Sequence, residues 1–192
     1  IIGRWCSLWN SGRLGDYLYF GADDGVNGYE LWRSNGTSTT IVADINLEFG
    51  SASSPYGFTA FGDWLYFAAA DATEGNELWR TNGTTITELV EDINVLTITS
   101  SDPYGFTVLG DWLYFSAIDS TTGRELWRTN GTTTERVADI NAGSPDSSPG
   151  EFAVLGNWLY VRADDGTSGP ELWRTNGTST TRVADINTAG TD

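Results

Sequence analysis

The chain of 192 residues contains no histidine, lysine, methionine or glutamine, and all ten of its basic residues are arginine. The absence of histidine excludes a Ser-His-Asp triad, a Cys-His pair and the usual His-bearing zinc sites. The absence of lysine excludes a P-loop lysine and a Schiff base. The single cysteine, Cys6, rules out an internal disulfide and a multi-cysteine metal cluster. Carboxylates, arginine, aromatic rings and hydroxyls remain to carry any chemistry.

The net charge is −16 and the pI is about 4.1, so we expect no binding to nucleic acid or to anionic membranes. No apolar run is long enough for a membrane helix, so no membrane insertion is expected. A chain that starts at Ile1 and lacks methionine is expected to be a processed or partial product. Together these features favour an extracellular or cell-surface location.

Three sequence blocks recur with one period. The tryptophans of a Glu-Leu-Trp-Arg-x-Asn-Gly-Thr block lie 47, 48 and 46 residues apart, in the segments Glu30–Thr37, Glu77–Thr84, Glu125–Thr132 and Glu171–Thr178. A Gly-Asp/Asn-aromatic-Leu-Tyr block begins at Gly15, Gly62, Gly110 and Gly156, and an Asp-Ile-Asn block begins at Asp44, Asp92, Asp139 and Asp185. Such a period indicates one structural unit copied and stacked. We expect one repeat domain over 1–192, with repeats at approximately 1–46, 47–94, 95–141 and 142–192.

The third repeat predicts four strands, over 103–109, 112–117, 125–129 and 134–140. The second is apolar on both faces, which is typical of a strand covered on both sides. Gly110-Asp111 predicts a tight turn, and Asn130-Gly131 predicts a type I′ hairpin, which needs positive φ at both positions. Four antiparallel strands in under fifty residues are typical of a β-propeller blade. We therefore expect an all-β fold with four blades, either a four-bladed ring or part of a larger ring or array; another stack of sheets is the alternative.

The Glu-Leu-Trp-Arg-x-Asn-Gly-Thr block resembles the bacterial ELWxxDGT repeat family, and the resemblance covers all four units. It implies propeller-like blades in a large secreted or surface protein, and it brings no established catalytic activity. This chain departs from the family at one position of every unit, where asparagine replaces the motif aspartate before Gly-Thr: Asn35, Asn82, Asn130 and Asn176.

The same four asparagines begin Asn-Gly-Thr sequons on turns that should be exposed, so they are candidate N-glycosylation sites. The alternative is that Asn-Gly only forms the turn. Aspartates in the loops offer the hard oxygen ligands that calcium prefers, at Asp23, Asp24, Asp164 and Asp165. No segment matches an EF-hand and aspartate is an ordinary turn residue, so a structural role is the alternative. No cofactor is required.

The motif glutamates are Glu30, Glu77, Glu125 and Glu171. Glycoside hydrolysis needs two carboxylates in unequal environments, and equivalent copies argue against it. We expect these glutamates to pair with the motif arginines of neighbouring strands. The motif tryptophans are expected in the core or between blades. Less regular aromatics are better candidates to stack on sugars: Trp5, Trp9, Tyr29, Tyr56 and Tyr104.

The first strand is irregular, because Ser11 stands where the later repeats have Phe58, Phe106 and Phe152. The nearby Trp5, Cys6 and Trp9 are candidates for contact with another copy, and Cys6 is either unreactive or bridges two chains. Arg162 replaces small residues of the other repeats and needs a partner or an exposed edge.

These patterns predict a non-catalytic extracellular structural protein that self-associates into a larger surface or filamentous assembly. The expected partners are copies of itself, with glycans as a further class. The alternatives are a carbohydrate-binding propeller and, third, an enzyme acting on extracellular polysaccharides.

Overall fold

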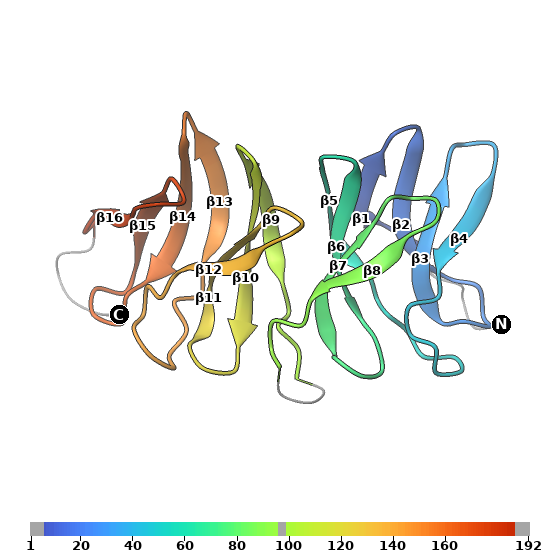
Figure 1. The fold of residues 1–192 in the computed structure, drawn as a ribbon, viewed down its shortest axis with the longest axis horizontal. Coiled ribbons are helices and arrows are strands. Elements are labelled where there is room, and N and C mark those ends of the chain that lie inside the picture. Colours follow the sequence, from blue (N-terminus) through green and yellow to red (C-terminus); the bar gives the residue numbers. More distant parts are fainter. Residues whose placement is uncertain (1–5, 96–98, 187–192) are drawn as a thin grey trace. The chain divides into compact units, whose positions relative to one another are not determined.

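The computed structural model describes residues 6–95 and 99–186, without the side chains of Ser7 and Trp9. Within these ranges the chain forms sixteen strands and no helix. Each strand pairs antiparallel with its neighbour in sequence, so the strands form four separate four-stranded sheets (Figure 1). We call these sheets blades 1 to 4, and each lies within one predicted repeat.

The chain divides into two compact units, residues 1–102 and 103–192, each containing two blades. Blade 1 consists of β1 (Cys6–Leu14), β2 (Tyr17–Asp23), β3 (Tyr29–Ser34) and β4 (Thr39–Ala43). Blade 2 consists of β5 (Tyr56–Phe61), β6 (Trp64–Ala70), β7 (Asn76–Thr81) and β8 (Thr87–Glu91). Blade 3 consists of β9 (Tyr104–Leu109), β10 (Trp112–Asp119), β11 (Gly123–Thr129) and β12 (Thr134–Ala138). Blade 4 consists of β13 (Gly150–Leu155), β14 (Trp158–Asp164), β15 (Pro170–Thr175) and β16 (Thr180–Ala184).

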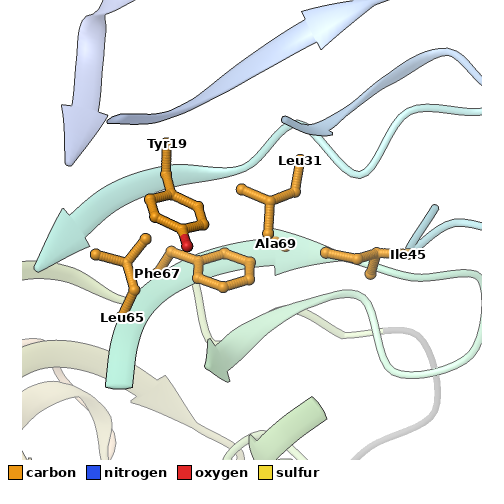
Figure 2. Close-up of a cluster of buried hydrophobic side chains, with 6 residues drawn as sticks. All are labelled: Tyr19, Leu31, Ile45, Leu65, Phe67 and Ala69. Carbon is orange, nitrogen blue, oxygen red and sulfur yellow. The ribbon is translucent and has the colours of Figure 1, made fainter. Parts of the chain in front are cut away.

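The second strand of each blade supplies most of the core. In β10 five consecutive residues, Leu113 to Ala117, are buried, so both faces of the strand are covered as its apolar sequence predicts. In the first unit, Tyr19 and Leu31 of blade 1 share a buried cluster with Leu65 and Phe67 of blade 2 (Figure 2). In the second unit, Tyr114, Leu126 and Leu159 form the corresponding cluster. Consecutive blades within a unit therefore pack face to face.

Of the two predicted turns, the tight turn at Gly110-Asp111 is confirmed and the Asn-Gly turn is not. The two-residue hairpins are the Gly-Asp and Gly-Asn turns, in which glycine has φ of +57° to +60° at the first position, as a type II′ turn requires. The Asn-Gly loops contain four residues, or five in blade 2, because Thr129 pairs with Thr134 and Thr81 with Thr87. Their asparagines do not have positive φ, so the predicted type I′ turn is wrong.

Strand β1 is irregular, as the sequence indicates, since its pairing with β2 shifts between Ser7 and Ser11. Asn10 in this bulge accepts a hydrogen bond from the backbone N–H of Gly57 on β5, at 3.2 Å. No helix in the part of the chain that the structure describes could span a membrane.

Candidate functional site

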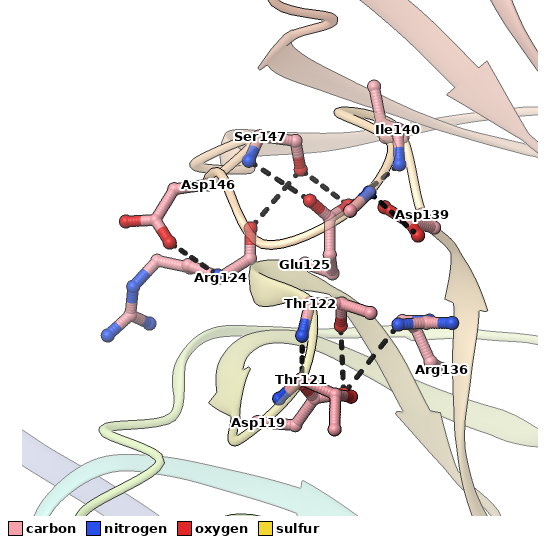
Figure 3. A network of polar contacts seen from close by, with 11 residues as sticks. Asp119, Thr121, Thr122, Arg124, Glu125, Arg136, Asp139, Ile140, Asp146 and Ser147 are labelled. Carbon is pink, nitrogen blue, oxygen red and sulfur yellow. Dashed lines mark hydrogen bonds and ion pairs between the residues drawn. The ribbon is translucent and has the colours of Figure 1, made fainter.

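The motif glutamate of blade 3 is the centre of a buried polar network (Figure 3). One carboxylate oxygen of Glu125 accepts the backbone N–H of Ile140 at 2.8 Å and the hydroxyl of Ser147 at 2.7 Å. The other accepts the backbone N–H of Ser147 at 3.0 Å. Because Ile140 follows β12 and Ser147 precedes β13, one side chain holds both ends of the connection to the next blade. We call this arrangement the glutamate clamp.

The clamp recurs with the same atoms in the first unit. Glu30 accepts the backbone N–H groups of Ile45 and Ser53, at 2.8 and 2.7 Å. Glu77 accepts those of Ile93 and Ser101, at 3.1 and 2.7 Å. In both clamps the serine hydroxyl donates as well, at 2.6 Å. Glu171 of blade 4 accepts the backbone N–H of Ile186 at 3.0 Å.

Burial governs the protonation of the clamps. Desolvation raises the pKa of Glu77 from 4.5 to about 7, against the lowering effect of its hydrogen bonds. The pKa values of Glu30 and Glu125 are raised for the same reason. Repeated carboxyls of raised pKa invite an acid–base function. Here, however, three of the four side chains have no exposed surface at all, and each accepts hydrogen bonds from its own connection, so they serve the architecture.

The expected pairing of motif glutamate with motif arginine is wrong. In each blade the arginine lies over the first aromatic ring of the second strand, with 4.0 Å between Arg128 Cζ and the Trp112 ring centre and 4.1–4.4 Å in the other blades. Arg128 also forms an ion pair with Glu135 on β12, and Arg80 forms one with Glu88 on β8. The motif glutamate lies on the other face of the strand, where the connection reaches it.

The serine of the clamp was not predicted from the sequence, although a repeated Ser-x-Pro pattern marks its position. Ser53, Ser101 and Ser147 each stand two residues before a proline, with the period of the repeats. The intervening residue has positive φ in all three, between +44° and +49° at Ser54, Asp102 and Ser148. A strained non-glycine residue that recurs at one position indicates that its surroundings hold it there.

The motif tryptophans are half-buried, and Trp79 packs against the core of the first unit. Their indole N–H groups are buried and have no hydrogen-bond partner among the described residues. Most of the irregular aromatics also have structural contacts. Tyr29 lies against Gly21, Tyr56 accepts a hydrogen bond from Asn76 at 2.8 Å, and Tyr104 lies 4.9 Å from Arg124 Cζ. Trp5 and the side chain of Trp9 lie outside the described residues, whereas Cys6 is exposed.

All four sequon asparagines act as turn caps. In each, the side-chain oxygen accepts the backbone N–H groups two and three residues ahead, at 2.8–3.0 Å. This geometry occupies the amide oxygen, whereas glycosylation uses the amide nitrogen. Asn35, Asn130 and Asn176 are exposed, while Asn82 is half-buried and its nitrogen donates to Thr85 at 3.3 Å. The structural role of Asn-Gly and a role as glycan acceptor are thus compatible.

The candidate calcium ligands cap their own loops. Asp24 accepts the N–H groups of Val26 and Asn27 at 2.8 and 2.9 Å, and Asp165 those of Thr167 and Ser168 at 2.9 Å. Asp23 and Asp164 each accept one N–H group, from the glycine two residues on. Within the described ranges, no three Asp, Glu or Cys side chains form a group that could hold a metal. Calcium binding stays a prediction.

Two equivalent hollows lie between consecutive blades. The hollow in the first unit, of about 530 Å³, includes Asp16, Tyr17, Arg33 and the sequon residue Asn82. The hollow in the second unit, of about 440 Å³, is lined by the matching Asp111, Trp112, Arg128 and Asn176, among others. In both, the motif arginine lies over the aromatic ring. A sugar that stacks on that face of the ring would have to displace the guanidinium group.

No family model and no curated protein matches this sequence. Solved structures do match its fold. One is from a study of two prolyl endopeptidases, with 11% identity and a TM-score of 0.60 over 93% of this chain and 26% of that chain. A putative TolB from Agrobacterium tumefaciens has 11% identity and a TM-score of 0.54 over 92% and 64%. The computationally designed protein Ika8 has 18% identity and a TM-score of 0.51 over 91% and 48%.

This chain spans less than two thirds of the length of each of those three proteins. At these identities the likeness establishes the fold alone. The predicted fold class is confirmed: the chain is an all-β protein built of four-stranded β-propeller blades.

Proposed function

We propose that this chain is a non-catalytic structural building block, which self-associates into a larger extracellular assembly. The observation that carries the proposal is the use of the repeated motif. Its glutamate holds the connection, its arginine covers an aromatic ring, and its asparagine caps the turn. The glutamate, the arginine and the asparagine of the motif therefore already have structural contacts within their own unit.

The equivalence of the blades also argues against catalysis. A hydrolase that uses carboxylates needs one that holds its proton and one that does not, within reach of one substrate. The clamp carboxyls of blades 1 to 3 have the same donors, the same burial and the same direction of pKa shift. Burial also keeps a substrate from reaching them.

Self-association can be tested on the purified chain by electron microscopy and sedimentation over a hundredfold range of concentration. We expect particles larger than one chain, whose proportion grows with concentration. Because each copy carries a net charge of −16, added salt should increase assembly by screening the repulsion. Dispersed single chains at every concentration and salt level would overturn the proposal.

We further propose that the sequons carry glycans when the chain passes through a pathway that glycosylates. Asn35, Asn130 and Asn176 should be occupied more fully than Asn82, because Asn82 is half-buried and its amide nitrogen is engaged by Thr85. Intact mass and peptide mapping, before and after an amidase that removes N-glycans, measure the occupancy of each site. An unchanged mass in material from its source would contradict this part of the proposal.

A further inference from the structure

Two leucines of the repeat lie at the interface between the two blades of each unit. In the first unit, Leu31 of blade 1 and Leu65 of blade 2 belong to one cluster and have no exposed surface. In the second unit, Leu126 of blade 3 and Leu159 of blade 4 do the same. Each interface therefore takes the motif leucine from one blade and the second-strand leucine from the next.

Of the four other leucines at these two positions of the repeat, Leu78 and Leu113 are also buried, whereas the remaining two are partly exposed. Leu172 is the motif leucine of blade 4, and 37% of its surface is exposed. Leu18 is the second-strand leucine of blade 1, and 39% of its surface is exposed. Burying such a side chain stabilises a contact, because it removes apolar surface from water. One half of a blade interface is thus exposed on blade 4, and the other half on blade 1.

The Asn-Gly loops show, independently of the leucines, which face of one blade packs on the next blade. Tyr19 and Arg33 of blade 1 reach the Asn-Gly loop of blade 2, where Arg33 donates to the carbonyl of Gly83 and the tyrosine leaves no room for a side chain. Tyr114 and Arg128 of blade 3 fill the space at Gly177 of blade 4 in the same way.

The corresponding groups of blades 1 and 4 make no such contact with the residues that the structure describes. At Gly36, in the loop of blade 1, an added side-chain carbon would meet nothing within 4 Å. On blade 4, Tyr160 is only half-buried, although Tyr19 and Tyr114 are buried. The Nε of Arg174 is buried without a hydrogen-bond partner in the part of the chain that is described.

We infer that blade 4 of one copy packs on blade 1 of a second copy, repeating the contact that joins blades within each unit. Leu172 covers Leu18, while Tyr160 and Arg174 reach the loop at Gly36. The inference rests on the proposed self-association and names the two surfaces that perform it. The contact is head-to-tail, so it produces a ring where the rotation closes and a filament where it does not.

The equivalence of the repeats favours a second copy as the occupant, because only another blade offers the matching leucine and Asn-Gly loop. Arg162 is exposed on blade 4, at the position that Gly21, Ala68 and Ser116 hold in the other blades. It lines a hollow of about 310 Å³ together with Glu151, Glu171, Leu172 and Ile186. Arg162 is the one positive group of this lining, and it can offset part of the repulsion between two copies of net charge −16.

The test uses the full chain and places an aspartate on one face at a time, as Leu172→Asp or Leu18→Asp. Each variant alone should sediment as a monomer, because a charge must otherwise be buried in the contact. A 1:1 mixture should form a dimer of one chain of each kind and nothing larger, since each variant keeps one intact face. Only folded chains can form this dimer, so its appearance also shows that both variants fold.

Two further variants sharpen the result. Leu47→Asp is the matched control, because Leu47 lies in the connection after blade 1 and is 82% exposed. This variant should assemble like the natural chain. Gly36→Asn adds a side chain at a position where the single chain has free space, and asparagine tolerates the left-handed backbone there. In the proposed contact the same space is filled by the second copy. Gly36→Asn should therefore weaken assembly at least about tenfold, which corresponds to about 1.4 kcal/mol.

The outcomes separate the two proposals. If the natural chain assembles and the Leu18 and Leu172 variants assemble equally well, the head-to-tail contact is wrong and the self-associating building block stands. If either variant alone forms dimers, the contacts join like faces and the inference is wrong. A natural chain that stays monomeric overturns the proposed function and the inference together.

Discussion

Replacing Glu125 with alanine should lower the free energy of unfolding of the unit that contains blades 3 and 4 by about 2–4 kcal/mol. The buried backbone N–H of Ile140 loses its acceptor, and a buried donor left unpaired costs about 1–3 kcal/mol. The N–H and hydroxyl of Ser147 lose the carboxylate but keep the Arg124 carbonyl as acceptor, at 3.0 and 3.3 Å. The melting temperature should fall by roughly 4–16 °C, given about 2–4 °C for each kcal/mol in a chain of this size.

The matched control is Glu135→Ala, which removes the same atoms from the same blade. Glu135 is partly exposed, and its ion pair with Arg128 should contribute less than about 1 kcal/mol. Urea unfolding at pH 5, followed by tryptophan fluorescence, compares the two variants with the natural chain. Equal losses in the two variants would mean that the clamp is no more important than a surface ion pair.

The free energy of unfolding should also fall as the pH rises from about 4.5 to about 8. Burial raises the pKa of Glu77 to about 7 in the folded chain, against 4.5 when the carboxyl is exposed by unfolding. The fold therefore binds this proton more tightly than the unfolded chain. Its contribution is fully present below about pH 4.5 and is lost as the pH rises through about 7. For Glu77 alone the loss is on the order of 3 kcal/mol.

The raised pKa values of Glu30 and Glu125 act in the same direction. Aspartates of the loops act in the opposite direction at lower pH. Hydrogen bonds from the N–H of Asn27 lower the pKa of Asp24, and hydrogen bonds led by the Thr167 hydroxyl lower that of Asp165. Their contribution is present above about pH 4 and is lost on acidification. Stability should therefore be greatest between about pH 4 and 5.

Urea unfolding at pH 4.5, 6 and 8 measures this dependence. Glu77→Ala should reduce the slope, because the variant has no carboxyl to titrate at that position. Glu48→Ala, at an exposed position in the connection to blade 2, should leave the slope unchanged. A free energy of unfolding that increases across this range would contradict the expected role of burial.

The local features of the blade could be predicted from the sequence because they depend on neighbouring residues. The doubly apolar run at Leu113 to Ala117 gave a buried strand, and the Gly110-Asp111 pair gave a two-residue turn. The conformation of the Asn-Gly loops could not be read in this way. Their asparagines cap a longer loop with the side chain, and this hydrogen bonding competes with the type I′ turn that the dipeptide favours.

The sequence by itself determined the four blades and their strands, since a fixed period and apolar alternation are properties of the chain read in order. Only the tertiary structure decided what the glutamates do. The backbone N–H groups that donate to Glu125 belong to residues 15 and 22 positions further along the chain. Only the path of the connection brings them to one carboxylate. The tertiary structure also separated Leu18 and Leu172 from their buried equivalents, because exposure depends on which blade faces are covered.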